Sequence, residues 1–386
     1  MSWLDDWVEG AQADLVGVRR QLHAHPELGH REHATTALIV ARLRAAGLAP
    51  VVLAGGTGVV CDVGSGSPTV GLRADIDALP LEDLKDVPYR SQDDGTCHAC
   101  GHDVHTAVLL GAGLALAATS FQGRVRLVFQ PAEEQMPGGA LDVLAGGHLT
   151  GMSALFALHC DPTLDVGLIG LKAGPITAAA DALEVQLTGP GGHTSRPHNT
   201  VDLVHALATV ATGLPDALSR LVDPRAGLSV VWGHISAGVA RNAIPRSGVL
   251  RGTLRVLDKS AWEGAPELVS RVVDDLVRPY GACAALNYQR GVPPVVNAPG
   301  ATALLSAAAS SALGPGAVVP TLQSLGGEDF GWYLDHVAGA MGRLGVRVPG
   351  GTTYDLHQGS FDVDEAAIGV GVKVLVTAAL AALRPG

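Results

Sequence analysis

Side chains of the kinds that bind metal ions occur at four places in this chain. The segment 97–103 reads Cys-His-Ala-Cys-Gly-His-Asp, and the segment 129–134 ends in two adjacent glutamates. A histidine follows the apolar run 154–158, and another lies near the C-terminus. Thiolate, imidazole and carboxylate are ligands of a catalytic zinc-like ion, and a carboxylate beside a ligand can act as a base. The pattern predicts a metal-dependent hydrolase, and the residues that carry it are Cys100, His102, Glu133, Glu134, His159 and His357.

The cysteine pair by itself is open to two plainer interpretations. Cys97 and Cys100 could be buried thiols in a turn, or a thioredoxin-like redox pair. A zinc ribbon would need a second such pair, which the chain lacks. The Gly-His-Asp that follows favours a metal site, because His102 is separated from Cys100 by one residue and can share an ion with it.

The carboxylates also have alternatives. Glu133 and Glu134 could be a solvated pair. They come directly after a buried-type strand, however, where one carboxylate can coordinate an ion while the other holds a proton. Asp75 and Asp77 follow Arg73, and they could cap a loop and pair with that arginine, or bind an ion or orient one of its ligands. On the residues alone, both interpretations of the aspartates stay open.

Short β-rich runs alternate with helical patterns in the N-terminal half, which indicates a layered α/β domain with a largely parallel sheet. In such sheets the carboxyl ends of the strands line the binding crevice. Asp75 and Asp77 follow one strand, the two glutamates follow a second and His159 follows a third. The predicted strands are 59–63, 69–73, 125–129 and 154–158, and the predicted helices are 34–46 and 104–118.

A different pattern begins near residue 179 and predicts an inserted module. Its order of elements, β-α-β-β-α-β, is that of a ferredoxin-like fold. The α/β pattern resumes afterwards with a helix at 301–313. We expect a metal-binding domain of residues 1–177 and 292–386, and an insertion of residues 178–291. The elements of the insertion are strands 182–188, 227–235, 248–256 and 283–289 and helices 200–217 and 261–277.

The bulk composition narrows the class of protein. The chain has 386 residues, 47% of them hydrophobic, which allows a large core in two or three domains. Its net charge is −11 and no basic stretch stands out, so neither nucleic acid nor a membrane is an expected partner. Residues 366–383 are apolar, but Lys373 and several glycines interrupt them, so we expect a buried helix there. The five cysteines and an N-terminus unlike a signal peptide favour the cytoplasm.

Taken together and in order, these motifs resemble the M20 metallopeptidase family. They are most similar to its amidohydrolase branch, which includes hippurate hydrolases, N-acyl-amino-acid aminoacylases and auxin-conjugate hydrolases. The resemblance spans nearly the whole chain, and so many ordered motifs are specific. They are His-Ala-His-Pro-Glu at 23–27, Leu-Arg-Ala-Asp-Ile-Asp-Ala-Leu-Pro at 72–80, Ala-Cys-Gly-His-Asp at 99–103, Phe-Gln-Pro-Ala-Glu-Glu at 129–134, Gly192–His193, Asn242, Glu-Asp-Phe at 328–330 and His357.

The resemblance implies a site for two divalent metal ions with Glu133 as general base. It implies that the insertion is a lid and dimerisation domain, and that the protein is a homodimer. His193 and Asn242 of this domain would polarise the scissile carbonyl, either in a neighbouring subunit or in their own after domain closure. Arg246 would contact the substrate carboxylate. The implied metal ligands are Cys100, His102, Glu134, His159 and His357.

The resulting hypothesis is a metal-dependent hydrolase of linear amide bonds, acting on small N-acyl amino acids. Thiolate and imidazole favour zinc, with manganese the other first candidate and cobalt or nickel the alternatives. Three other functions stay open: a dipeptidase or carboxypeptidase on the same site, a catalytically silent metal- or ligand-binding protein, and a redox protein using Cys97 and Cys100. Recognition of a free amine would separate a dipeptidase from an amidohydrolase, and the sequence does not reveal it.

Overall fold

The computed structural model describes residues 2–384, which form two compact units. Of the described residues, the larger unit contains 2–176, Val296–Leu322 and 329–384. The smaller unit contains Thr177–Val295 and Gln323–Glu328. The second of these segments lies outside the predicted insertion. It belongs to the smaller unit because the Gln323 amide donates hydrogen bonds to the backbone carbonyls of Thr177 and Leu257.

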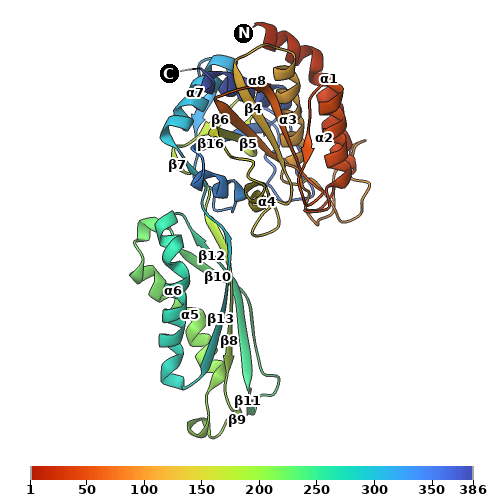
Figure 1. Ribbon diagram of the computed structural model, residues 1–386. Helices are drawn as coiled ribbons and strands as arrows, with labels where there is room; N and C mark the ends of the chain where they lie inside the picture. Colours follow the sequence, from red (N-terminus) through yellow and green to blue (C-terminus); the bar gives the residue numbers. More distant parts are fainter. Residues whose placement is uncertain (1, 385–386) are drawn as a thin grey trace. The chain divides into compact units, whose positions relative to one another are not determined.

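A mostly parallel sheet forms the centre of the larger unit (Figure 1). Its middle strands β4, β3, β5 and β16 all run in the same direction, while β1, β2 and β6 add antiparallel pairs. Parallel sheets are covered on both faces, so their strands are continuous apolar runs. Within residues 2–384 the strands, in sheet order, are β1 (Val51–Val52), β2 (Val59–Ser65), β4 (Gly123–Gln130), β3 (Thr69–Asp75), β5 (Met152–Asp165), β16 (Gly339–Arg347), β6 (Ile169–Leu171) and β15 (Val318–Pro320).

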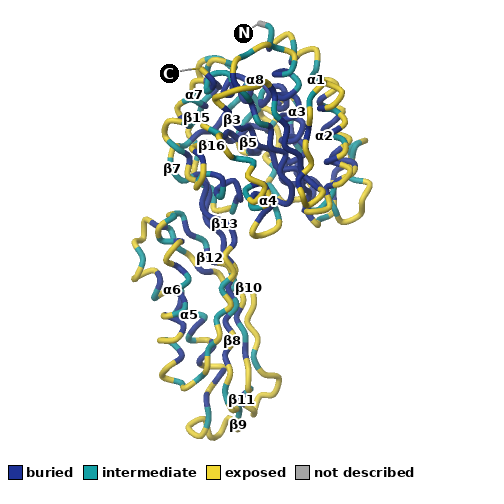
Figure 2. Tube along the Cα trace, in the orientation of Figure 1, coloured by how far each residue is buried: buried dark blue, intermediate teal, exposed yellow. Residues whose placement is uncertain are grey.

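Helices enclose this sheet, and α3 and α8 are dark along most of their length in the view coloured by burial (Figure 2). Helix α8 packs against α1, α3 and α7, as expected for a buried helix near the C-terminus. In the part of the chain that the structure describes, no helix has the length and apolar character needed to cross a bilayer. The helices of the larger unit are α1 (Ser2–Ala24), α2 (His33–Ala45), α3 (His102–Ala117), α4 (Ala140–Ala145), α7 (Pro299–Leu313), α8 (Ala366–Ala382) and the 3₁₀ helix η4 (Asp329–Asp335), and β7 (Gly174–Pro175) pairs with β14 (Val296–Asn297).

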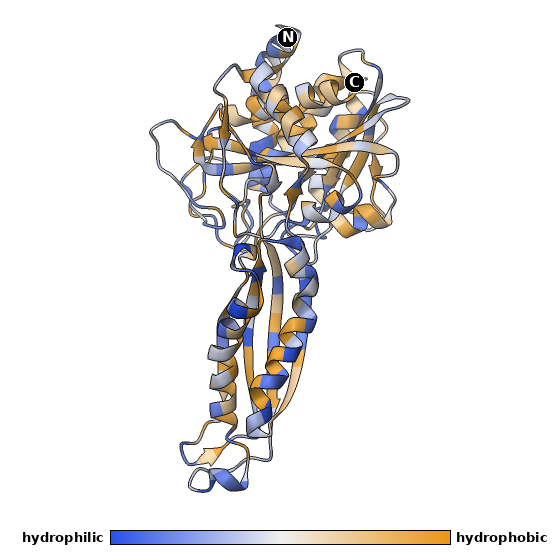
Figure 3. Cartoon of the chain, turned by 90° about the vertical axis from the view of Figure 1, so that its left-hand side faces the viewer, coloured by the Kyte–Doolittle hydropathy of each residue, from blue (hydrophilic) through white to orange (hydrophobic). Residues whose placement is uncertain are grey.

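The smaller unit is a four-stranded antiparallel sheet with two helices. The strand order β10-β12-β8-β13 and the chain order β-α-β-β-α-β are those of a ferredoxin-like fold. Hydrophobic and hydrophilic patches alternate along both helices (Figure 3), as expected when one face packs on a sheet. The elements are β8 (Ala179–Thr188), α5 (Leu203–Leu221), β10 (Ser229–Ala237), β12 (Ser247–Val256), α6 (Lys259–Val277) and β13 (Cys283–Val292), with β9 (Gly192–His193) and β11 (Ala243–Ile244) forming a separate pair.

These two units confirm the predicted fold class, a layered α/β domain with an inserted ferredoxin-like module. The start of α5 differs from the prediction, which placed it at residue 200. Helix α5 begins at Leu203 because the Asp202 side chain accepts a hydrogen bond from the His205 amide and caps the helix. The preceding segment, Pro197–Asn199, forms a short 3₁₀ helix instead.

Candidate metal centre

Three neighbouring strands and the start of one helix place the predicted site residues. Strand β3 ends at Asp75, β4 ends at Gln130 just before the two glutamates, and β5 carries His159. Helix α3 begins at His102. Because β3, β4 and β5 are parallel, their carboxyl ends meet at one edge of the sheet. The residues at the ends of β3 and β4 therefore gather beside His159, which lies within β5 and not after it as predicted, because β5 continues to Asp165.

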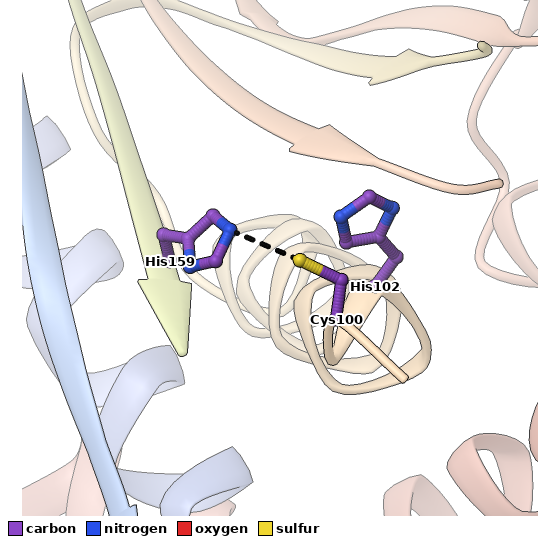
Figure 4. Close-up of side chains that lie close together, drawn as sticks. All are labelled: Cys100, His102 and His159. Atoms are coloured by element: carbon purple, nitrogen blue, oxygen red, sulfur yellow. Dashed lines mark hydrogen bonds between the residues drawn. The ribbon is translucent and has the colours of Figure 1, made fainter. Parts of the chain in front are cut away.

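Cys100, His102 and His159 form a buried cluster at this edge (Figure 4). Each offers one ligand atom, and these three atoms all lie within 4.8 Å of one another. The Cys100 Sγ is 3.5 Å from the His159 Nε2. A thiolate and two imidazoles at this separation are a suitable donor set for a divalent cation.

Both glutamates and the C-terminal histidine lie beside this cluster. The Glu134 Oε1 is 3.9 Å from the His102 Nε2 and 3.1 Å from the His357 Nε2. The Glu133 Oε2 is 4.0 Å from the His102 Nε2. The amide of His357 donates to the carbonyl of Ala99, which ties the C-terminal segment to the loop that carries Cys100. The structure thus brings together all five residues expected as ligands, with Glu133 next to them.

Hydrogen bonds to the second nitrogen orient two of the imidazoles. The His102 Nδ1 donates to Asp77, whose carbonyl oxygen is 3.0 Å away and whose Oδ1 is 3.2 Å away. The His159 Nδ1 donates to the carbonyl of Cys160 at 2.8 Å. In both rings this leaves Nε2 facing the cluster. Asp77 also accepts from the Glu134 amide at 3.0 Å, so one aspartate orients two of the expected ligands.

Two further observations indicate that this set of donor atoms suits a bound cation. Among the described residues, the His102 Nε2 and the Glu134 Oε1 are buried without a hydrogen bond of acceptable geometry. Such groups are costly to bury unless something satisfies them. Burial, together with Glu134 and Glu133, raises the pKa of the Cys100 thiol well above its usual range. Burial alone would lower the pKa of His102, but Asp75 and Asp77 outweigh it and raise that pKa to about 10. The carboxylates therefore make the surroundings of the cluster negatively charged, and a bound cation would offset that charge.

Asp75 is oriented differently from Asp77. Its Oδ1 accepts from the His105 Nδ1 at 2.5 Å, and its Oδ2 accepts from Arg73 at 2.7 Å. The same Oδ2 lies 3.8 Å from the His102 Nε2. The pairing with Arg73 is one of the two arrangements that the sequence left open. His105 was not singled out in the sequence, although the spacing His102-x-x-His105 at a helix start places both side chains on one face.

The three residues expected to touch the substrate belong to the smaller unit. His193 lies on β9 and pairs with Ala243 of β11, and the Thr194 amide donates to the carbonyl of Asn242. The Arg246 Nε donates to the carbonyl of Pro190. All three side chains are exposed; Asn242 directly precedes β11 and Arg246 shortly follows it. The metal-type residues, by contrast, all belong to the larger unit.

Gly101 separates two of the expected ligands, and we expect Gly101→Ala to weaken metal binding. Gly101 has a φ of +86°, and a Cβ there would lie 2.7 Å from the Cys160 Sγ. A side chain in the left-handed region costs about 1–2 kcal/mol, and the contact with Cys160 adds to that cost. The loop relieves this strain by moving Cys100 and His102, so metal affinity falls by roughly tenfold or more. Competition with a chelator measures the change.

The matched control for this substitution is Gly47→Ala. Gly47 also has a positive φ, +77°, but a Cβ there would meet nothing within 4 Å. Gly47→Ala should lower the free energy of unfolding and leave metal affinity unchanged. Equal metal affinities for Gly101→Ala and wild type would contradict a role of this turn in the site.

Comparison with known proteins places this arrangement in a family. The model of peptidase family M20/M25/M40 matches residues 71–381. A protein of Rhodococcus jostii (strain RHA1) named as glutamate–cysteine ligase 2-3 is 48% identical over 374 residues. The match covers 96% of this chain and 47% of that relative, so this chain spans about half the length of the relative. The N-acetyl-L-cysteine deacetylase of Bacillus subtilis (strain 168) is 37% identical, over 92% of this chain and 85% of the relative.

A solved structure shows the same architecture. It is that of the YXEP protein of Bacillus subtilis, a dinuclear metal-binding peptidase of the M20 family. It is 33% identical to this chain and superposes with a TM-score of 0.85, covering 97% of this chain and 99% of the other. By these matches over almost its whole length, the chain belongs to peptidase family M20/M25/M40 and is a hydrolase of amide bonds.

Proposed function

We propose that this protein hydrolyses the amide bond of small N-acyl amino acids. The observation that carries the proposal is the position of Glu133 beside the expected ligands, with its Oε2 4.0 Å from the His102 Nε2. Cys100, His102, Glu134, His159 and His357 would hold two divalent ions. When bound, such ions lower the pKa of water and polarise a carbonyl oxygen.

The protein residues divide the remaining work. The Glu133 carboxylate takes the proton of the attacking water and then returns it to the nitrogen of the leaving amine. Asp77 keeps the His102 ring and the Glu134 backbone in place through its two carboxylate oxygens. The low exposure of Glu133, 10% for its side chain, limits competition from bulk water for that proton.

Cysteine is the amino acid that the relatives suggest testing first. One relative is named for the deacetylation of N-acetyl-L-cysteine. The more similar relative is named for the ligation of glutamate to cysteine, although this chain spans only about half of it. The support for an N-acylated cysteine as the substrate therefore comes from the relatives named for deacetylation. The thiol of such a substrate is a further soft ligand that a zinc-type site accepts readily.

A hydrolysis screen tests the proposed function. The protein is stripped with a chelator and reloaded with zinc, manganese, cobalt or nickel, and release of the free amine is followed by chromatography. The substrates are N-acetyl-L-cysteine, N-acetyl-L-serine as its match without a thiol, N-benzoyl and long-chain N-acyl amino acids, and plain dipeptides. We expect N-acetyl-L-cysteine to be cleaved and dipeptides to be poor substrates. Faster cleavage of dipeptides would assign the same site to a dipeptidase, and no cleavage of any amide would contradict the proposal.

We also propose that the smaller unit forms a homodimer and supplies His193 to the partner's site. Within residues 2–384, β10 pairs only with β12, so its other edge is open to a second copy. Val231 on this strand is 64% exposed. The His193 Nδ1 accepts a hydrogen bond from the Ser195 amide, so its ring proton lies on Nε2 and can be donated to a carbonyl oxygen.

Mixing two inactive variants should restore activity if His193 acts in the partner's site. His193→Ala and Glu133→Ala homodimers should each be nearly inactive. Unfolding and refolding them together produces mixed dimers, in which one site has both residues and the other has neither. With random pairing of equal amounts, about a quarter of all sites recover. Turnover and the dimer fraction are measured on the same sample.

A second mixture provides the control. Glu133→Ala refolded with His102→Ala should recover nothing, because both residues belong to the larger unit and to one site. If the first mixture also recovers nothing while mixed dimers form, His193 serves its own chain or does not serve catalysis. A protein that sediments only as a monomer would also contradict the dimer.

A further inference from the structure

His105 lies between the two buried histidines that are expected to bind metal, and it makes hydrogen bonds with both of its ring nitrogens. The Nδ1 is 2.5 Å from the Asp75 Oδ1, and the Nε2 is 2.8 Å from the backbone nitrogen of Cys160. Its side chain is almost completely buried. The bond to Cys160 reaches the residue directly after His159, so His105 connects α3 to the strand that carries that ligand.

These contacts determine which ring nitrogen of His105 carries the proton. A backbone amide can only donate, so Nε2 must accept from Cys160. The ring proton therefore lies on Nδ1, where it is donated to the Asp75 carboxylate. This bond is charge-assisted and short, and it fixes the ring plane.

The amide of Cys160 needs this partner because the ladder between β5 and β3 stops before it, although β16 still pairs with β5 at Cys160. The ladder between β5 and β3 ends at the pair Ala157 and Arg73. Beyond that point β5 continues to Asp165, and the Cys160 amide donates to His105 instead of to a strand. The imidazole thus takes the place of β3 on that side of β5, next to the point where β5 presents His159.

The ring of His105 also fills the space beside both expected ligands. Its centroid is 4.9 Å from that of His159 and 5.4 Å from that of His102. Contacts on two sides and hydrogen bonds at both nitrogens leave the ring little freedom. A change in its position would be passed on to His159 through both the ring contact and the Cys160 backbone.

The other end of this connection is anchored by a buried network of charges. Asp75 accepts from the Arg73 Nη1 at 2.7 Å, and the Arg73 Nη2 donates to Asp329 at 2.8 Å. Gln130 bonds both Arg73 and Asp329. Every one of these side chains is buried. Buried charges are tolerated when their partners are complete, and a complete network is rigid.

We infer that His105 is a positioning residue, which holds the expected metal ligand His159 in place by linking Asp75 to the Cys160 amide. The inference rests on the proposed metal site. The alternative is that His105 only fills and satisfies the core, in which case its loss would change stability and not the geometry of the ligands. The two can be separated by measuring metal binding directly.

The test compares His105→Leu with His105→Gln in chelator-stripped protein. Leucine has a similar size but leaves Asp75 and the Cys160 amide without their partner. Glutamine can place an oxygen where it accepts from Cys160 and an NH₂ where it donates to Asp75. Cobalt(II) is titrated into each protein, its affinity is obtained by competition with a chelator, and its visible spectrum reports the ligand geometry. Urea unfolding of the metal-free proteins measures stability separately.

We expect His105→Leu to bind cobalt about 10–100-fold more weakly, the usual cost of removing a group that orients a ligand. Its spectrum should change, whereas His105→Gln should regain most of the affinity and the wild-type spectrum. Asn297→Ala is the control for a buried hydrogen-bonding residue elsewhere in the larger unit. It should lose stability and keep the wild-type affinity and spectrum.

Three results would overturn the inference. One is wild-type affinity and spectrum in His105→Leu. If His105→Leu does not fold, His105→Asn replaces it, because the shorter amide keeps the place of Nδ1 beside Asp75 and does not reach Cys160. Wild-type cobalt affinity and spectrum in His105→Asn are the second result. The third is an absence of cobalt binding in wild type, which would overturn the metal site itself and so is distinct from a failure confined to His105.

Discussion

Glu133→Gln is expected to lower turnover by roughly 10²–10⁴-fold, the usual contribution of a positioned general base, while metal content stays near that of wild type. Glutamine has the size of glutamate but cannot take up the proton of the attacking water. Glu133 lies near the His102 Nε2, but it is Glu134 that approaches both His102 and His357. Loss of the Glu133 charge should therefore affect proton transfer more than metal binding. Steady-state kinetics on the substrate found in the screen, with metal analysis of the same sample, measures both quantities.

Glu134→Gln is the matched control, because the two residues are adjacent and chemically identical. In the wild-type protein the Glu134 Oε1 is buried and lacks a hydrogen bond among the described residues, as expected of an atom that binds an ion. Glu134→Gln should therefore lose metal, and its activity should fall as a consequence. If Glu133→Gln loses metal while Glu134→Gln keeps it, the two roles are exchanged.

Cys100→Ala is expected to lose metal and, with it, almost all activity. Cys100 is the only thiol in its cluster with His102 and His159, and alanine offers no donor atom. Removal of a group that only orients a ligand costs about 10–100-fold in metal affinity, so loss of a ligand should cost more. Metal content after gel filtration and chelator competition measures the effect. Alkylation of the thiol is less informative, since without metal the high pKa and burial of Cys100 also make it unreactive.

Cys61→Ala is the control for this substitution. Cys61 is buried in β2 of the same sheet, a strand that carries none of the expected metal ligands. Its replacement leaves a cavity of similar size and should lower stability without loss of metal. A fully metallated and active Cys100→Ala enzyme would contradict the proposed two-metal site.

Much of the fold could be predicted from the sequence, because it depends on local patterns. Continuous apolar runs predict the buried parallel strands, such as β4 and β5, since both faces of such a sheet are covered. The alternating pattern of β8 and the order of elements after it predict the ferredoxin-like unit. The residues at which individual helices and the two units begin and end were less predictable. The start of α5 depends on the Asp202 cap, and the assignment of Gln323–Glu328 to the smaller unit depends on hydrogen bonds to distant carbonyls.

The sequence by itself determined which residue types are available for chemistry and at which strand ends they occur. Cys100, His102 and the two glutamates could be identified from their spacing, because residues close along the chain stay close in space. What only the tertiary structure decided is the direction of each side chain. Asp77 orients His102 and the Glu134 backbone, whereas Asp75, two residues earlier, bonds Arg73 and His105. Neither the pairing of His105 with the Cys160 amide nor the approach of His357 to Glu134 follows from local periodicity, since each joins segments that meet only when the sheet and its helices pack.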